Sequence, residues 1–112
     1  MPRKKEYPVT RPMANPAHPG LLLKEEITKG LKLKIGEAAE MLDIDRTTLS
    51  RLMNGHIAMS VEMAMRLSKA LNTTPNVWLG MQQAYDLAQA RKRRIDLSRV
   101  QRFDSGSPHA PA

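Results

Sequence analysis

Two short helical patterns separated by only three residues dominate the stretch from residue 35 to residue 55, IGEAAEMLDIDRTTLSRLMNG. Apolar residues recur at helical spacing in both halves of this stretch: Ala38, Ala39 and Leu42, then Leu49, Leu52 and Met53. The residues between them, Asp43 to Asp45, are too few for a loop of their own. The sequence therefore predicts two helices, over about 35–42 and 46–53, that lie at a steep angle to each other.

The residues around this turn favour helix ends. Asp45 is a good N-cap because its carboxylate can accept hydrogen bonds from the free backbone N–H groups of the next turn. Ile44 is an apolar residue that can pack into the angle between the helices. Asn54 and Gly55 both tolerate a left-handed conformation and predict the end of the second helix. Two helices joined in this way describe a helix-turn-helix.

The outward face of the second predicted helix carries only polar and basic side chains: Arg46, Thr47, Ser50 and Arg51, with Thr48 at the edge. Arginine can pair with O6 and N7 of guanine, and the threonine methyl can contact the 5-methyl group of thymine. A solvated helix face would show the same residue types. In the context of the turn, we interpret this face as one that enters the DNA major groove, with base contacts from Arg46, Thr47 and Arg51.

Phosphate contacts are expected around this face from a second set of polar side chains, which comprises Lys34, Thr48, Ser50, Asn54 and His56. Lys34 stands beside the N–H groups that begin the first helix of the motif, where an anion can bind. One helix reads too few base pairs for useful specificity. We therefore expect a homodimer that reads an inverted repeat, with half-sites about one helical turn apart.

Composition limits the other possibilities for this chain of 112 residues. Its length indicates one domain with tails, and its many Leu, Ala and Met residues with few aromatic ones indicate an all-α fold. The absence of cysteine excludes disulfides and cysteine-bound metals and fits a cytoplasmic protein. No apolar run is long enough for a membrane span, and no apolar signal core follows the basic N-terminus.

The positive charge lies near the two ends of the chain. The formal net charge is +7, with +3 in residues 1–12, none in residues 13–90, +5 in residues 91–102 and −1 in residues 103–112. Such a basic chain is compatible with nucleic acid, a membrane surface or an acidic partner. Charge alone does not choose among these partners.

The pattern along the chain predicts five helices between two tails. Residues 1–19 hold five prolines and are expected to form a flexible basic arm. The domain then covers residues 20–93, with a first helix over about 20–29 that Pro19 or Gly20 opens and Gly30 ends. A fourth helix begins after Ser60 and ends at Asn72, and a fifth covers 75–93 after Thr74 and Pro75. Residues 94–112 are expected to be a basic tail that becomes disordered.

The fifth predicted helix carries large side chains around most of its circumference. Trp78, Met81 and Tyr85 share one face, and such residues belong more often to a core than to an interface. Because Leu79 and Leu87 lie elsewhere on the helix, it is also the natural dimer element. Gly80 within this helix costs about 1 kcal/mol relative to alanine. We therefore expect close packing against a neighbouring backbone at Gly80.

Three segments of the chain closely resemble the HigA/VapI family of antitoxins, which has the Xre or lambda-repressor-like fold. They are HPGLLLKEEI at 18–27, RTTLSRLMNG at 46–55 and SVEMAMRLSKALNTTPNVWLGMQQAYDL at 60–87. The resemblance covers about 70 residues, and its last segment is the most diagnostic. It implies a homodimeric DNA-binding antitoxin of a type II toxin-antitoxin pair. Such a protein represses its own operon and binds a RelE-like ribonuclease toxin, HigB.

Two positions depart from the pattern of this family. Asp43 stands in the turn where the family usually has glycine, and Asn72 stands where glycine often ends the fourth helix. Aspartate and asparagine are the residues other than glycine that best tolerate a positive φ. Neither departure therefore argues against the fold.

An enzyme is not expected from this sequence. His18, His56 and His109 are scattered, and no glycine-rich phosphate loop or nucleophile with an adjacent base is present. We expect no metal and no cofactor. Two other readings stay open, a stand-alone Xre-type transcriptional repressor without a toxin partner and a protein-protein interaction module.

Overall fold

The computed structural model describes residues 15–103, and within that range the chain is helical with no strand. The elements are α1 Pro19–Glu25, η1 Glu26–Gly30, α2 Ile35–Leu42, α3 Arg46–Met53, α4 Val61–Leu71 and α5 Pro75–Arg93. The all-α prediction with five helices is confirmed, as is the helix-turn-helix at 35–55. The expectations for residues 1–14 and 104–112, including His109, lie outside the described residues.

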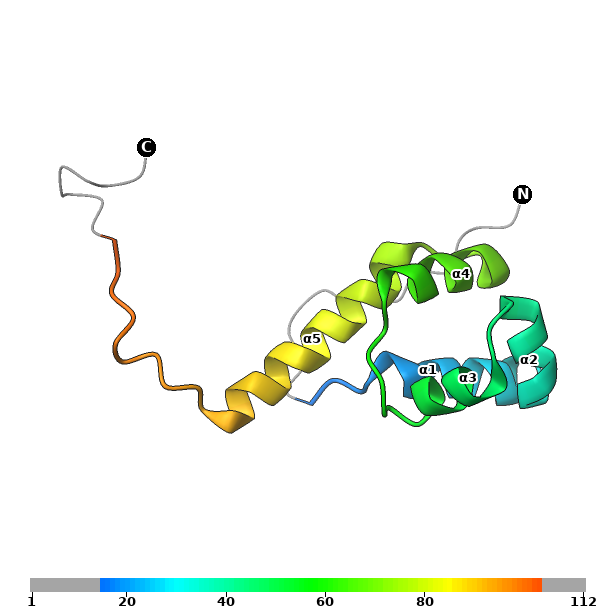
Figure 1. The fold of residues 1–112 in the computed structure, drawn as a ribbon, viewed down its shortest axis with the longest axis horizontal. Helices are drawn as coiled ribbons and strands as arrows, with labels where there is room; N and C mark the ends of the chain where they lie inside the picture. Colours follow the sequence, from blue (N-terminus) through cyan, green and yellow to red (C-terminus); the bar gives the residue numbers. More distant parts are fainter. Residues whose placement is uncertain (1–14, 104–112) are drawn as a thin grey trace.

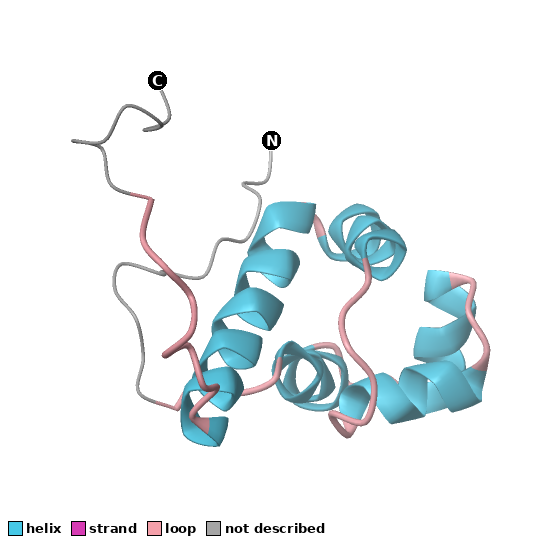
Figure 2. Cartoon of the chain, turned by 60° about the vertical axis from the view of Figure 1, so that its left-hand side comes forward, coloured by secondary structure: helices cyan, strands magenta, loops and turns pink. Residues whose placement is uncertain are grey.

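The first three α-helices gather on one side of the molecule and the last two on the other (Figure 1). α1 packs on both α3 and α5, and α2 packs on both α3 and α4. Figure 2 shows the loop from α3 to α4 crossing between the two groups of helices. Residues 94–103 continue from the end of α5 and extend away from the helical body (Figure 1).

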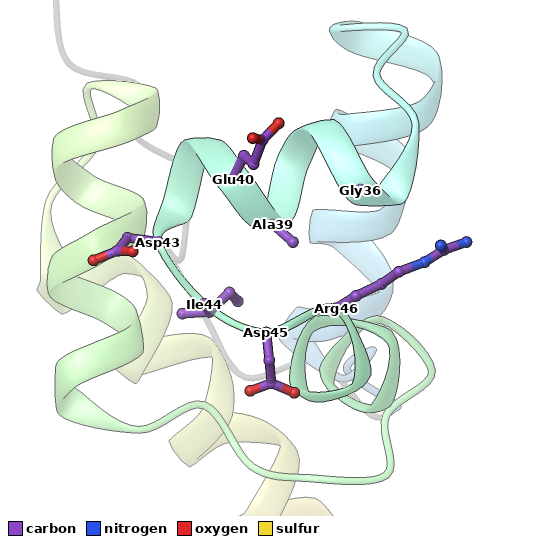
Figure 3. A pocket seen from close by; sticks show the side chains of 7 residues that line it. All are labelled: Gly36, Ala39, Glu40, Asp43, Ile44, Asp45 and Arg46. Atoms are coloured by element: carbon purple, nitrogen blue, oxygen red, sulfur yellow. The ribbon is translucent and has the colours of Figure 1, made fainter.

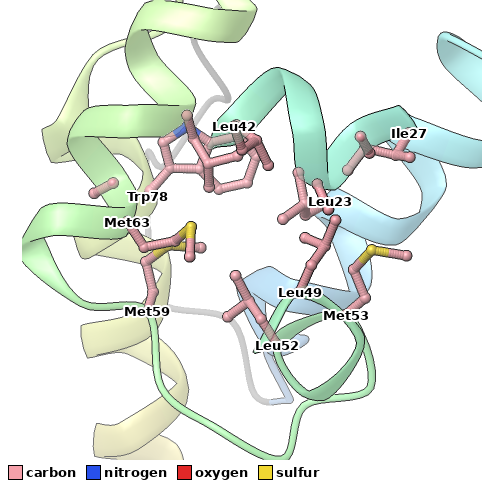
Figure 4. Packing of buried hydrophobic residues seen from close by; sticks show 13 residues of the cluster. Leu23, Ile27, Leu42, Leu49, Leu52, Met53, Met59, Met63 and Trp78 are labelled. Atoms are coloured by element: carbon pink, nitrogen blue, oxygen red, sulfur yellow. The ribbon is translucent and has the colours of Figure 1, made fainter. Parts of the chain in front are cut away.

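The core lies where the two groups of helices meet, and it is built from aliphatic, methionine and tryptophan side chains (Figure 4). Leu23 and Ile27 of the first helical segment, Leu49 and Leu52 of α3, and Trp78 of α5 have no exposed surface. Full burial of an aliphatic or aromatic side chain of this size contributes about 1.5–3 kcal/mol. The core therefore joins α3 to both neighbouring groups of helices.

Side-chain caps begin four of the helices. The cap oxygen or nitrogen accepts a hydrogen bond from a backbone N–H in the first turn of α1, α3, α4 and α5; the caps are His18, Asp45, Ser60 and Thr74. The predicted caps Asp45, Ser60 and Thr74 are confirmed. The cap at His18 has no counterpart in the sequence analysis.

Four of the described helices end on a residue with a left-handed backbone: Asp43 (φ 54°), Gly55 (φ 73°), Asn72 (φ 56°) and Arg94 (φ 52°). After the first three, the next backbone N–H bonds to the carbonyl five residues before it, as in Ile44 to Ala39, which satisfies carbonyls at the helix end. The tolerance of Asp43 and Asn72 for a positive φ is confirmed. The predicted end of α3 at Asn54 and Gly55 is confirmed: Asn54 follows the last helical residue with a φ of −100°, and Gly55 makes the left-handed turn.

The first helical segment begins at one of the two residues predicted to open it and ends at the predicted Gly30, but its last part is wound differently. α1 begins at Pro19, and both His18 and Pro19 are buried, so the packed chain starts before residue 20. The segment reaches Gly30 by a wider turn, η1, in which the Leu31 N–H donates to the Glu26 carbonyl at 2.8 Å. The positive φ of 55° that follows is at Lys32 rather than at a glycine.

Close backbone packing occurs at Gly20 and not at Gly80. A Cβ atom on Gly80 would meet nothing within 4 Å outside its own helix, so the expectation of a close neighbour there is wrong. A Cβ on Gly20 would lie 1.7 Å from the carbonyl oxygen of Leu52. The helix α1 can therefore approach the end of α3 only because residue 20 has no side chain.

Candidate nucleic-acid interface

The turn between α2 and α3 is held by hydrogen bonds at each end. The Asp45 carboxylate accepts the Thr48 backbone N–H at 2.9 Å and the Thr48 hydroxyl at 2.6 Å. These two bonds hold the pKa of Asp45 below its usual value, so the carboxylate stays ionised at the start of α3. At the other end of the turn, Arg66 of α4 donates to the carbonyls of Leu42 and Asp43 at 3.0 and 2.9 Å. The orientation of α3 is therefore fixed before any ligand is present.

The three residues expected to contact bases all lie on the exposed side of α3. Arg46, Thr47 and Arg51 are exposed, while Leu49 and Leu52 face the core. Figure 3 shows the Arg46 side chain extending away from the turn, in a different direction from the carboxylates of Asp43 and Asp45. None of the ion pairs found within residues 15–103 involves Arg46 or Arg51. Both guanidinium groups are therefore available for an anionic or hydrogen-bonding partner.

The residues expected to contact phosphate lie around this exposed side in different settings. Lys34 and His56 are exposed. The Lys34 backbone N–H, however, already donates to the Glu37 carboxylate at 2.8 Å, which places a negative charge at the start of α2. The Asn54 side chain is exposed and donates to the Ser50 carbonyl at 2.8 Å. It keeps its amide oxygen and one N–H for another partner.

Thr48 and Ser50 are half-buried. The Thr48 hydroxyl is committed to Asp45, which leaves it no donor for a phosphate. Thr48 therefore has a structural role in capping α3, whatever else it contacts. The Ser50 side chain lies at the border of the exposed face, and its carbonyl accepts from Asn54.

Two open hollows flank the turn, and acidic groups line both of them. The first lies between α2 and α3 and is lined by Gly36, Ala39, Glu40 and residues 43–46 (Figure 3). The second lies between α3 and the beginning of α4, where Asp43, Asp45 and Glu62 surround an apolar floor that includes Ile44 and Met63. Carboxylates repel phosphate. The exposed side of α3 that carries Arg46 and Arg51 therefore suits an anionic ligand better than either hollow.

On α5, the residues predicted as core or dimer contacts differ in burial. Trp78 is completely buried, and its indole N–H donates to the Thr73 hydroxyl at 2.7 Å. Met81 is half-buried against the core. Tyr85 is half-buried and packs edge-on against the ring of His18, with the ring centroids 5.0 Å apart. Trp78 is thus a core residue of the single chain.

His18 is a buried polar residue that the sequence analysis left among scattered histidines. Its Nδ1 accepts the Gly20 N–H at 2.9 Å, so the neutral ring carries its proton on Nε2. Burial lowers the pKa of His18, although the Ile57 backbone and the charge of Asp86 oppose that shift. The HPG sequence could have indicated a capping histidine before Pro19. Its contacts with the α3–α4 loop and with α5 depend on tertiary structure.

Gln82 is the second buried polar residue that the sequence analysis missed. Its side-chain oxygen accepts the Met59 backbone N–H at 2.7 Å, and its side-chain amide donates to Asp86 at 2.9 Å. The sequence analysis also missed Arg66, a half-buried residue that bonds to the end of α2. Each of these bonds joins residues more than 20 positions apart, except that between Gln82 and Asp86. No local sequence signal reports such contacts.

Two other kinds of site are absent from the described part of the chain. Residues 15–103 hold no cluster of three or more His, Asp or Glu side chains that could bind a metal ion. Within the same range, no helix has the length and apolar character needed to cross a bilayer.

Comparison with known proteins places this geometry in a family. A helix-turn-helix family model matches residues 23–78. The chain is 46% identical over 89 residues to virulence-associated protein A' of Dichelobacter nodosus, covering 79% of this chain and 76% of the relative. It is 35% identical over 78 residues to antitoxin HigA-1 of Vibrio cholerae, covering 70% and 73% of the two chains.

Among solved structures, antitoxin GraA in complex with its operator superposes with a TM-score of 0.73 at 34% identity, covering 85% of this chain and 97% of that one. The region matched by the family model includes the turn, the exposed α3 face and the beginning of α5. The chain therefore belongs to the helix-turn-helix family, in the branch that contains the HigA and VapI antitoxins.

Proposed function

We propose that this protein is a sequence-specific antitoxin that binds an inverted-repeat DNA operator as a homodimer, represses its own operon and neutralises a RelE-like HigB toxin. The observation that carries the DNA-binding part is the pair of exposed guanidinium groups, Arg46 and Arg51, about one and a half turns apart on a short capped helix. The complex of the similar antitoxin GraA with its operator supports the same assignment.

In this proposal α3 lies in the major groove. Arg46, Thr47 and Arg51 contact base edges, and arginine pairs with guanine through two parallel hydrogen bonds. Asn54 and His56, which follow α3, meet the phosphates on one side of the groove. Lys34, at the start of α2, meets phosphate on the other. Ser50 and Thr48 lie beside these contacts, where Thr48 acts mainly by capping α3 through Asp45.

The dimer is proposed to form along α5. This helix is 19 residues long, and Leu87 is about half exposed on it while Leu79 and Met81 are half-buried. A second copy related by a two-fold axis would cover these side chains and present two α3 helices to successive major grooves. The toxin would then bind a surface other than the α3 face, and no contact residues are assigned to it.

Arginine substitution tests the DNA-binding part. Replacing Arg51 with alanine should weaken binding to the operator by about 1–3 kcal/mol, because it removes a base contact. Its backbone carbonyl would still accept the His56 N–H, so the helical content should not change. Lys69→Ala, which removes an exposed charge from the last turn of α4, is the matched control. Equal operator affinity of the Arg51 and Lys69 variants would show that Arg51 does not contact a base.

The toxin part requires a separate experiment. The candidate toxin is the small basic protein encoded by an adjoining reading frame. This protein should arrest growth when it is expressed alone, and its co-expression with this chain should restore growth. A stand-alone repressor would bind operator DNA without rescuing growth from any such product. An interaction module would rescue growth and yet not be retained on random duplex DNA. A DNA-binding protein would be retained, with a steep loss of binding as the salt concentration rises, because it neutralises phosphates.

A further inference from the structure

The loop after α3 contains the two residues proposed to meet phosphate, and two buried polar residues outside the helix-turn-helix hold this loop in place. Residues 54–60 connect α3 to α4, with Asn54 and His56 exposed on them. The loop is fixed to α3 only at its beginning, where the His56 backbone N–H donates to the Arg51 carbonyl at 2.8 Å. Its remaining length therefore depends on contacts with other elements.

His18 holds the first half of this loop. Its ring lies against Gly55, where a Cβ atom would be 3.7 Å from the ring, and it is close enough to the Ile57 backbone for that backbone to favour the protonated ring. On its other side the ring packs against Tyr85 of α5. The residue that caps α1 thus also supports the residues on both sides of His56.

Gln82 holds the second half. The Met59 backbone N–H has its hydrogen bond to the Gln82 side chain in a buried environment, and Gln82 is only 7% exposed. The Asp86 carboxylate, one turn further along α5, accepts a hydrogen bond from the side-chain NH2 of Gln82. This bond orients the amide so that its oxygen faces the loop. Gln82, Tyr85 and Asp86 recur at helical spacing. One face of α5 therefore supports the loop at two places.

We propose that Gln82 and His18 are positioning residues for phosphate binding. They do not contact DNA themselves, and they hold Asn54 and His56 against the DNA backbone. This inference rests on the proposed DNA-binding function and adds a role for α5 within each half-site. The alternative, in which these residues only stabilise the fold, predicts a loss of folded protein with unchanged behaviour of the folded fraction. The two possibilities differ in the salt dependence of binding.

The test compares Gln82→Leu with Gln83→Leu, which changes the exposed neighbour on the same helix. Affinity for operator and for random duplex DNA is measured at several salt concentrations, at a temperature where melting curves show each variant fully folded. Loss of one phosphate contact in each half-site removes two contacts from the dimer complex and should lower the salt slope by about two. Between about 50 and 200 mM salt, the operator affinity of the dimer should then fall about 12-fold less than in the wild type. The preference for operator over random DNA should not change.

A swapped pair distinguishes the hydrogen bonds from packing. Gln82→Glu keeps an acceptor for the Met59 N–H but places a second negative charge beside Asp86. It should therefore show the same reduced salt slope as Gln82→Leu. Adding Asp86→Asn supplies an amide that donates to the new carboxylate, and it should restore the wild-type slope. This pair also serves if the leucine variant does not fold.

Three outcomes would overturn the inference. The first is equal salt slopes for Gln82→Leu and Gln83→Leu. The second is a defect in Gln82→Glu that Asp86→Asn does not reverse. The third is a wild-type protein that fails to bind DNA in a salt-dependent way, which would overturn the proposed function as well. A reduced slope in Gln82→Leu with recovery in the swapped pair would support it.

Discussion

Adding one methyl group at Gly20 should separate α1 from α3. The missing Cβ would sit 1.7 Å from the Leu52 carbonyl oxygen, and contacts of a Cβ atom below 3.0 Å essentially never occur. Neither side can move freely, because the Gly20 N–H is bound to His18 at 2.9 Å and the Leu52 carbonyl accepts the Gly55 N–H at 3.0 Å. The two helices would therefore have to move apart by more than 1 Å, through the part of the core around Leu23 and Leu49.

The magnitude follows from two opposing effects. Overpacking of a core costs about 1–3 kcal/mol, and the obstacle here is backbone rather than a flexible side chain, which favours the upper half of that range. Alanine also reduces the entropy of the unfolded chain, which offsets about 0.4–1 kcal/mol. The net destabilisation of Gly20→Ala should be about 2 kcal/mol. Gly80→Ala, which meets no neighbour within 4 Å, should instead stabilise α5. Its gain should be about 0.5–1 kcal/mol.

The assay is thermal and urea unfolding followed by circular dichroism, repeated at several protein concentrations so that effects on association are separated from effects on the single chain. A difference of 1 kcal/mol shifts Tm by about 4–8 °C in a domain of this size, so the two variants should differ by more than about 10 °C. Wild-type stability in Gly20→Ala would refute the close approach of α1 and α3. A loss of stability in Gly80→Ala that does not depend on protein concentration would show that α5 has a neighbour at Gly80 within the single chain.

Three further predictions concern other parts of the molecule. Deletion of residues 91–112 should weaken binding to all DNA sequences, or weaken dimerisation, with no change in base preference; a shifted preference in a selection from random duplexes would contradict this. His18 has a pKa below its ordinary value of 6.5, so its contribution to stability is present above pH 6.5 and is lost as the pH falls through the lowered value. Urea unfolding between about pH 7.5 and 5 should show this loss in the wild type and not in His18→Asn, which keeps a cap that does not titrate. Trp78→Phe removes the donor to the buried Thr73 hydroxyl and should cost about 1–3 kcal/mol, with most of that cost absent when Thr73 is already valine.

Local chemistry accounts for the parts of the fold that could be predicted from the sequence. Asp45, Ser60 and Thr74 cap helices because short polar side chains reach the N–H groups of the next turn, and that rule needs no knowledge of the rest of the chain. The same holds for the left-handed residues Asp43 and Asn72. The exposure of Arg46 and Arg51 follows from the helical spacing of their apolar neighbours.

Tertiary contacts account for what could not be predicted. Gly80 and Gly20 are both helical glycines in the sequence, and only the approach of a second backbone distinguishes them. His18, Gln82 and Arg66 bind partners from other elements, and nothing in their local sequence names those partners. Lys32 adopts a positive φ that its residue type does not favour, and nothing in the structure explains why a lysine stands there. The assignment of bases and phosphates to particular side chains stays a prediction.

The clamp made by Arg66 has a thermodynamic consequence. Because this guanidinium joins α4 to the carbonyls at the end of α2, the turn that carries α3 and its exposed face is already ordered in the free chain. Association with a duplex then costs little conformational entropy on the protein side. The heat-capacity change of binding should correspond to the surface in contact and to released counterions, without the additional heat-capacity change that accompanies folding of a segment upon its target.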